Sequence, residues 1–391
     1  MKFLVVAQAL DLKYRLGCVP SWWQLLKALH EVGNEVIVTP YLGKPIESLW
    51  WRIYGNPCTR ESIMFNSYLE RKKRKGEAPN GKSLLSPVFD LLIKRYIRPK
   101  WERHLMKIIK KERDVDVILM LGIPINHING IPSKIKKTFD IPIAYYEGDM
   151  PTILPKYAVD REFKFNYYEG ADLSEFDAFF SNSKGVVPEL EEAGAKNVHA
   201  LYWAIDPMLF TPVNVKKDID ISFYGHGSEL REEWMEKMIT NPSKKMPDVN
   251  FSIGGGNFRI DLGNAKLVGP IPFSAFRNFC CRSKINLNIT RWTHTNVYAS
   301  ATARPFELAA YGACIVSQPY NGIEEWFKVG KELFVANSEE EAMELYKWLL
   351  DDEEEREKAG KKARERILKE HTFHHRANEM VKIIKSTNSG I

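Results

Sequence analysis

The chain has 391 residues, 44% of them hydrophobic and 27% charged, a composition typical of globular proteins and unlike that of disordered or fibrous chains. Its length suggests two domains, and its formal net charge of +6 is too small to indicate nucleic acid as a partner. The five cysteines are scattered without CxxC spacing, so we expect reduced thiols, a cytoplasmic protein and no structural zinc.

The first 40 residues alternate between apolar strands and a helix. "KFLVVAQ" and "EVIVTPY" predict strands, and "SWWQLLKALHEVG" between them predicts a helix. Residues 41–100 are rich in Trp, Pro, Lys and Arg, and we expect an irregular insertion there. No apolar run approaches the roughly 20 residues of a membrane span, so any membrane contact is expected to be peripheral.

The rest of the chain repeats the strand and helix alternation twice. The first series contains "VDVILMLG", "IPIAYYEGD", "AFFSNS" and "VHALYWAID", and the pattern restarts with "IDISFYGHG", "VNFSIGGG", "AKLVGPIP", "INLNIT" and "CIVSQP". This order predicts an α/β fold with doubly wound, mostly parallel sheets. We therefore predict two Rossmann-like domains, residues 1–212 and 213–372, facing a cleft, and a C-terminal helix, residues 373–391, that packs back on the first domain.

Ligands of open α/β sheets bind beyond the carboxyl ends of the strands. A candidate ligand-binding residue should therefore lie at the carboxyl end of a predicted strand. The pairs Asp114/Asp116 and Asp218/Asp220 resemble a metal-holding DxD motif, but both lie at the amino ends of predicted strands. We interpret them as solvated residues and predict no metal site.

Glu307 passes the same test. The strand "INLNIT" ends near Thr290, a helix is predicted to begin around Arg304 and Pro305, and Glu307 is expected in its first turn. A helix amino terminus beside an arginine suits a diphosphate, and a carboxylate there can accept hydrogen bonds from ribose hydroxyls. The alternative is an acid that only stabilises the helix dipole.

Several segments resemble motifs of one enzyme family, and they occur in the same order along the chain as in that family. "RPFELAAYGACIVSQPYNGIEEWF" resembles the nucleotide-sugar motif of GT-B glycosyltransferases of the group 1 (GT4-like) type. "FFSNSKGVVPELEEAGAKNVHALYWAIDPMLFTP" resembles the segment that closes the family's first domain, and "DISFYGHGSELREEW", "KLVGPIPFSAF" and "SKINLNIT" resemble elements of its second domain. "HTFHHRANEM" resembles the C-terminal helix of the CgeB-related branch, which crosses back onto the first domain. The resemblance covers residues 140–385 well and residues 1–40 weakly.

The resemblance implies a set of donor-binding residues in the second domain. They are Glu307, Arg304, Pro305, Phe306, Gly225, His226, Gly227, Arg231 and Gly269. Glu307 would bind the ribose and Arg304 the diphosphate, while the glycine turn at Gly225 and Gly227 would let backbone N–H groups approach phosphate. A glycine pair after a strand is also common without a ligand, and His226 would then only cap a helix.

One position departs from the family pattern. Many relatives carry a second glutamate eight residues before Glu307, where this sequence has Ala299. The donor sugar is therefore not identified, although His294, Asn296 and Tyr298 in the same loop offer replacement contacts. That loop is alternatively packed against the second sheet.

The first domain is expected to supply the acceptor side of the reaction. Glu147 and Asp149 follow the strand "IPIAYYEGDMP", and a carboxylate in a cleft can take the proton of an attacking hydroxyl. We expect Asp149 to be this base. The alternative is an Asp that ends a strand and begins a turn with Pro151.

Residues 94–113 combine a basic face with apolar residues at helical spacing. Such a helix could lie on an anionic bilayer, or it could be an ordinary helix of the domain whose basic face is solvated. The second interpretation is favoured.

Together these features predict a glycosyltransferase that moves a sugar from a UDP- or GDP-sugar to an unidentified glycan, lipid-linked or small-molecule acceptor. We expect no metal and no cofactor, and the lack of GxGxxG after the first strand argues against NAD. A sugar-nucleotide epimerase and a non-catalytic nucleotide-sugar-binding protein are the alternatives. A cytoplasmic location is expected. The alternative is a cytoplasmic protein that also contacts the inner membrane face peripherally.

Overall fold

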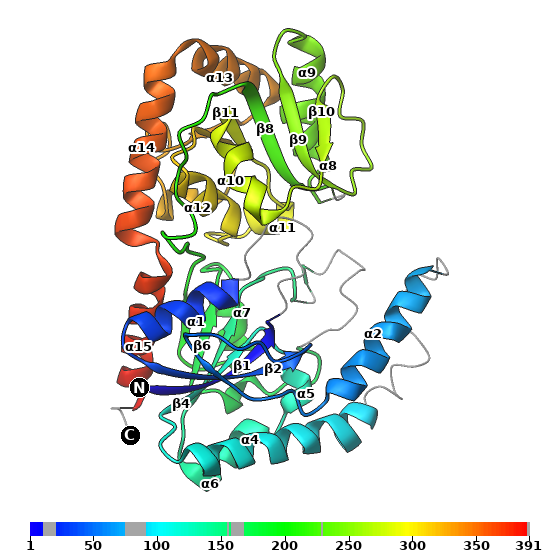
Figure 1. The fold of residues 1–391 in the computed structure, drawn as a ribbon, viewed down its shortest axis with the longest axis vertical. Coiled ribbons are helices and arrows are strands. Elements are labelled where there is room, and N and C mark those ends of the chain that lie inside the picture. The colour runs from blue at the N-terminus through cyan, green and yellow to red at the C-terminus, as the bar shows by residue number, and fades with distance from the viewer. Residues whose placement is uncertain (11–20, 75–90, 155, 158–167, 228–229, 389–391) are drawn as a thin grey trace. The chain divides into compact units, whose positions relative to one another are not determined.

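The computed structural model describes residues 1–10, 21–74, 91–154, 156–157, 168–227 and 230–388. They divide into two compact units (Figure 1). The described residues up to Leu201 and those from Ala377 onward form the first unit, and Tyr202–Arg376 form the second. Within these ranges no helix has the length and apolar character needed to span a membrane.

The first unit is built on a seven-stranded parallel sheet with the strand order β3-β2-β1-β4-β5-β6-β7. Its strands are β1 (Lys2–Ala9), β2 (Glu35–Leu42), β3 (Arg52–Ile53), β4 (Val117–Leu121), β5 (Ile143–Glu147), β6 (Ala178–Ser181) and β7 (Val198–Ala200). Every residue of β4 and β5 is buried. A parallel sheet covered on both faces needs continuous apolar strands. The segments that form β4 and β5 can therefore be recognised as apolar runs in the sequence.

The helices of the first unit connect these strands. They are α1 (Ser21–Glu31), α2 (Thr59–Arg74), η1 (Ile93–Ile97), α4 (Arg98–Glu112), α5 (Ile125–Ile128), α6 (Ile131–Phe139), η2 (Leu173–Glu175), α7 (Val187–Glu192) and most of α15 (Phe373–Asn388). The expectation that residues 41–100 are irregular needs correction, because this interval contains β3, α2, η1 and the start of α4. Residues 75–90 lie outside the described part of the chain.

The second unit contains a six-stranded parallel sheet with the order β10-β9-β8-β11-β12-β13. Its strands are β8 (Ile219–His226), β9 (Phe251–Gly256), β10 (Lys266–Gly269), β11 (Ser283–Asn288), β12 (Ile315–Ser317) and β13 (Phe334–Val335). Its helices are α8 (Glu232–Met235), η3 (Glu236–Thr240), α9 (Asn241–Lys245), α10 (Phe273–Cys281), α11 (Trp292–Thr295), α12 (Ala303–Ala310), η4 (Ile323–Glu325), α13 (Glu339–Asp351) and α14 (Glu353–Glu370).

Two apolar clusters stabilise the second unit. One joins residues of α10, α12 and α14, and the other joins residues of η3 and α13 to the central strands. The predicted α/β class with two parallel sheets is confirmed.

The units divide between Leu201 and Tyr202, eleven residues before the boundary placed at 212 from the sequence. The reason is packing: Ile205 and Phe210 are fully buried in the first apolar cluster of the second unit. Backbone bonds hold the same segment, since the Ile205 N–H donates to the His371 carbonyl at 3.2 Å and the Phe373 N–H donates to the Ile205 carbonyl at 3.0 Å. An extended segment without helix or strand periodicity conceals such contacts from sequence inspection.

Candidate functional site

Glu307 lies on α12, which follows β11 through a loop at the carboxyl end of that strand. The helix begins at Ala303, after the N-cap residue Thr302. Glu307 is therefore the fifth helical residue and lies in the second turn, not in the first turn as expected. This position weakens the interpretation of Glu307 as a helix-dipole acid, because that effect fades beyond the first turn.

Arg304 and Glu307 form a buried ion pair one turn apart on α12. The Arg304 Nη1 lies 2.8 Å from the Glu307 Oε2, and the side chains are 16% and 5% exposed. Burial raises the pKa of Glu307, and the adjacent guanidinium opposes this shift. The guanidinium also lies over the rings of Phe276 and Tyr224, at 4.5 and 5.1 Å from their centroids. Both charges are thus held in one orientation in a poorly solvated place.

The two residues between Arg304 and Glu307 have a packing role. Pro305 is buried, and Phe306 is fully buried against the rings of Trp326, Phe327 and His371. The ring of Phe306 therefore belongs to the core, and its assignment as a donor contact stays a prediction.

The glycine turn after β8 is explained largely by close packing. A Cβ at Gly227 would lie 2.5 Å from the Cα of Phe258, so no larger residue fits without movement of the backbone. Arg231 donates from Nη1 to the His226 carbonyl at 2.6 Å, and burial together with Arg231 lowers the pKa of the His226 imidazole. Gly225 is a strand residue paired with Gly255. The glycines need no ligand to account for them, and their phosphate role stays a prediction.

Gly269 ends β10, and it has a positive φ of 78° with no neighbouring atom within 4 Å of a built Cβ. The open space at this position leaves room for a ligand. Its role in donor binding stays a prediction.

The loop that carries Ala299 is tightly packed. Ala299 is fully buried at a positive φ of 44°, and His294 is 1% exposed. The His294 Nδ1 lies 3.0 Å from the Ser300 Oγ, and its Nε2 lies 2.9 Å from the Arg291 Nη2. Tyr298 donates to Glu325 at 2.7 Å. His294 is therefore packed within the loop, whereas Asn296 is exposed.

In the first unit, Glu147 ends β5 and is 5% exposed. Its Oε1 accepts from the N–H groups of Gly148 at 3.0 Å and Asp149 at 3.2 Å, and its Oε2 lies 3.0 Å from the Tyr145 hydroxyl. Burial, and secondarily the charge of Asp149, raise the pKa of Glu147 to about 7. Glu147 is thus a poorly accessible group that holds the backbone of the following turn.

Asp149 is half-buried and follows Glu147 in this turn. Asn182, just beyond β6, fixes the next residue from both sides: its Oδ1 accepts from the Met150 N–H at 2.8 Å and its Nδ2 donates to the Met150 carbonyl at 3.1 Å. The turn is therefore rigidly placed at the carboxyl edge of the first sheet, with Asp149 more accessible than Glu147.

The two DxD pairs lie at amino ends of strands, and they form ion pairs. Asp114 pairs with Lys2, and Asp218 pairs with Arg282 at 2.6 Å. Asp220 pairs with Lys284 at 2.7 Å. Among the residues the structure describes, no group of three or more His, Cys, Asp and Glu side chains is arranged to hold a metal ion.

Comparison with known proteins bears on both units. Residues 231–382 match the model of a family described as glycosyl transferase-like. Sucrose-phosphate synthase from Thermosynechococcus elongatus superposes with a TM-score of 0.69 at 13% identity, over 100% of this chain and 99% of that one. This chain has the GT-B fold. Anabaena HepE in complex with UDP and glucose has a TM-score of 0.61 at 10% identity, over 99% of this chain and 100% of that one.

A glycosyltransferase from Rickettsia africae shows the same GT-B fold, with a TM-score of 0.60 at 11% identity over 99% of this chain and 98% of that one. No curated protein sequence matches the chain. The resemblance to GT-B glycosyltransferases is therefore confirmed. The finer placement in the CgeB-related branch stays a prediction.

Arg291, a basic residue in the loop after β11, was not singled out in the sequence. It is the N-cap residue of α11 without a side-chain cap bond, and its guanidinium contacts His294. A basic residue soon after a predicted strand end was the available signal. It was concealed because "RWTHTNVYASATA" has no helical or strand periodicity.

Proposed function

We propose that this protein transfers a sugar from a nucleoside diphosphate sugar to the hydroxyl group of an acceptor. The observation that carries the proposal is the glycosyl transferase-like match, which includes the helix bearing Arg304 and Glu307. The alignment with HepE, solved with UDP and glucose, supports a UDP-sugar as the first donor to test.

In this proposal Arg304 and Glu307 bind the donor together. Glu307 accepts hydrogen bonds from the ribose, and Arg304 pairs with the diphosphate. Because Glu307 is buried and paired with Arg304, hydrogen bonds donated by ribose hydroxyls to its carboxylate would be strong in this poorly solvated place. The existing ion pair keeps the guanidinium oriented before the donor arrives.

The chemical step in this proposal uses Asp149. It removes the proton from the acceptor hydroxyl as the oxygen attacks the anomeric carbon, while the bond from that carbon to the diphosphate breaks. Glu147 is the weaker candidate for the base, because it is buried and its oxygens contact Tyr145, Gly148 and Asp149. We assign Glu147 to positioning the turn that carries Asp149.

The binding half is tested by calorimetry with UDP, GDP and uridine. Glu307→Gln should raise the Kd for UDP by about 10- to 100-fold, since hydrogen bonds to charged groups contribute roughly 1.5–3 kcal/mol. A direct ribose contact predicts a similar loss for uridine, whereas an effect exerted through Arg304 predicts a loss for UDP alone. Glu324→Gln, at an exposed residue of the same unit, is the matched control. Normal UDP binding by a less stable Glu307→Gln would assign Glu307 to the fold only.

The catalytic half is tested by donor consumption over a panel of glycan, lipid-linked and small-molecule acceptors. Asp149→Asn should lower the transfer rate by about 100- to 10,000-fold and leave UDP affinity unchanged. Transfer should persist in EDTA, since the proposal includes no metal ion. A normal rate in Asp149→Asn would move the base elsewhere. Conversion of the donor to an epimer without any acceptor would replace the proposal by an epimerase.

A further inference from the structure

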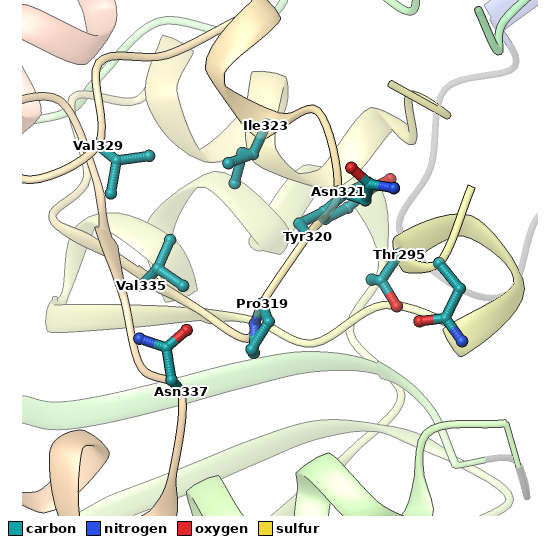
Figure 2. Close-up of a pocket in the computed structure, with 9 residues that line it drawn as sticks. Thr295, Pro319, Tyr320, Asn321, Ile323, Val329, Val335 and Asn337 are labelled. Atoms are coloured by element: carbon teal, nitrogen blue, oxygen red, sulfur yellow. The ribbon is translucent and has the colours of Figure 1, made fainter. Parts of the chain in front are cut away.

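A hollow of about 670 Å³ lies at the carboxyl ends of β12 and β13, entirely within the second unit (Figure 2). Its walls come from the end of α11, the segment after β12, and residues in and after β13. This volume lies within the range of roughly 300–1,000 Å³ that is usual for small-molecule sites. Asn296, offered above as a contact to the donor sugar, is among its lining residues, whereas Arg304, Glu307 and Asp149 are not.

The polar lining consists of uncharged groups. The carboxamides of Asn296, Asn321 and Asn337 supply both donors and acceptors, whereas the Thr295 hydroxyl already donates to the Trp292 carbonyl and accepts from Gln318. No Lys, Arg, Asp or Glu is among the described lining residues, so an anionic or cationic ligand would find no counter-charge. Hydroxyl groups, which donate and accept, are the natural partners of carboxamides.

The two valines of the lining lie on one side, next to one of the asparagines. Figure 2 shows Val329, Val335 and Asn337 on that side and Asn321 and Thr295 on the other, with Ile323 and Pro319 between them. A ligand with one C–H-rich face and a rim of hydroxyls would match both sides at once. A pyranose ring has this shape and chemistry.

The site is held in place without a ligand. The Asn321 N–H donates to the Thr295 carbonyl at 2.9 Å, and the Ala299 N–H donates to the Asn321 carbonyl at 2.9 Å. A Cβ at Gly322, whose φ is 82°, would lie 2.3 Å from the Ala299 nitrogen, so only glycine allows this approach of the two loops. The Asn337 Nδ2 donates to Glu341 at 2.8 Å, which fixes the third carboxamide with its oxygen still able to accept.

We propose that this hollow is a binding subsite for a neutral sugar, separate from the residues assigned to the nucleotide. Its wall is the loop that continues from Thr295 through Ala299 to Thr302, the N-cap residue of α12. The subsite thereby shares a rigid loop with the helix that carries Arg304 and Glu307. The inference goes beyond the proposed function, and it stands on the lining chemistry alone.

Saturation-transfer NMR on the whole chain tests the proposal with glucose, galactose, mannose, N-acetylglucosamine and maltose, and with glucuronate as the anionic comparison. At least one neutral sugar should receive saturation in the absence of nucleotide, and glucuronate should not. Asn321→Leu and Asn337→Leu together should lower the affinity for that sugar by about tenfold or more, because each substitution removes hydrogen bonds without creating space. Both residues are exposed, so a retained thermal unfolding temperature is expected and is measured alongside.

The matched control is Asn278→Leu on α10, an exposed asparagine outside the hollow, which should leave sugar binding unchanged. Saturation of none of the neutral sugars would overturn the proposal, and so would equal binding by the double variant. A sugar signal that needs UDP and disappears in Glu307→Gln would place the sugar in the donor site and also overturn it. UDP titration of the same samples reports on the proposed function separately, so the two failures are distinguishable.

Discussion

In the first unit, the buried carboxyl group of Glu147 has a raised pKa that should affect the stability of the fold. Its pKa of about 7 lies above the ordinary 4.5 because the carboxyl is buried and lies near the charge of Asp149, while the hydrogen bond from the Tyr145 hydroxyl opposes this shift. Between these two values the folded chain keeps a proton that the unfolded chain has lost. The resulting contribution to stability is complete below about pH 4.5 and is lost as the pH rises through about 7.

We therefore predict that Glu147→Gln reduces the loss of stability between about pH 5 and 8. The amide keeps an oxygen for the N–H groups of Gly148 and Asp149 and gains an N–H for the Tyr145 hydroxyl. Denaturant unfolding at several pH values measures the slope, with the exposed Glu169→Gln as control. If the free energy of unfolding of Glu147→Gln depends on pH as steeply as that of the wild type, another group is responsible for the pH dependence.

At the scale of single residues, the sequence predicted some candidates and missed the reasons for others. Glu307 was found by its place after a strand, yet its turn was misplaced because the helix start was taken from Arg304 and Pro305, and Thr302, a favoured N-cap residue type, was passed over. Phe306 was grouped with its neighbours in a motif, whereas its side chain faces the core. The asparagines around the hollow come from separate loops, and only the folded backbone brings Asn321 to Thr295.

Among the helices, α4 shows how one pattern supports two functions until burial is known. Its apolar stripe is used by the core, because Trp101, Leu105 and Ile108 are buried. Arg98 is also occupied, since it donates to the carbonyls of Asn126 at 2.8 Å and His127 at 3.3 Å. The membrane interpretation is thereby reduced to its exposed basic residues, which include Arg103, Lys107 and Lys110.

If α4 contacts anionic lipid, the attraction is electrostatic. Co-sedimentation with phosphatidylserine vesicles should then fall as salt rises, because screening shortens the interaction to about 8 Å near physiological ionic strength. Replacing Arg103, Lys107 and Lys110 by Gln should weaken it further. The control removes the same charge elsewhere, at Lys331, Lys347 and Lys361, all exposed. Binding that ignores salt and both triple variants would leave the solvated-face interpretation of α4.

The elements that could be predicted are those with continuous apolar runs, such as β1 and β4. The two-residue strand β3 escaped prediction because its residues are Arg52 and Ile53, too few for any periodicity. Its parallel pairing with β2 at Ile37 and Val38 supplies the signal that the local sequence lacks.

For the whole molecule, the path of the chain matters more than any one helix. After completing the second unit, the chain returns to the first at Ala377, and Ala377, Met380 and Ile384 on α15 are at most 2% exposed. Ile384 and Thr387 border the amino ends of β4, β5 and β6 together with Val117, Ile143 and Ala178. The C-terminal residues therefore complete the first core.

This arrangement predicts which unit a C-terminal change affects. Met380→Ala should cost about 2–5 kcal/mol, as is usual for a buried methionine. Hydrogen exchange should quicken in β4 and β5 while β8 and β9 keep their protection. Lys382→Ala, at an exposed residue of the same helix, should change neither. Equal loss of protection in both sheets would instead indicate that they unfold as one.

The return of α15 also has a consequence for biosynthesis. When Leu201 leaves the ribosome, the sheet of the first unit has been made, but Ala377, where the part of α15 that borders the amino ends of β4, β5 and β6 begins, is still 176 residues away. At elongation rates of roughly 5–20 residues per second, the nascent first unit must wait about 10 to 35 s for it. During that interval its apolar edge is open to chaperones, and truncated products released early would carry the same exposed edge.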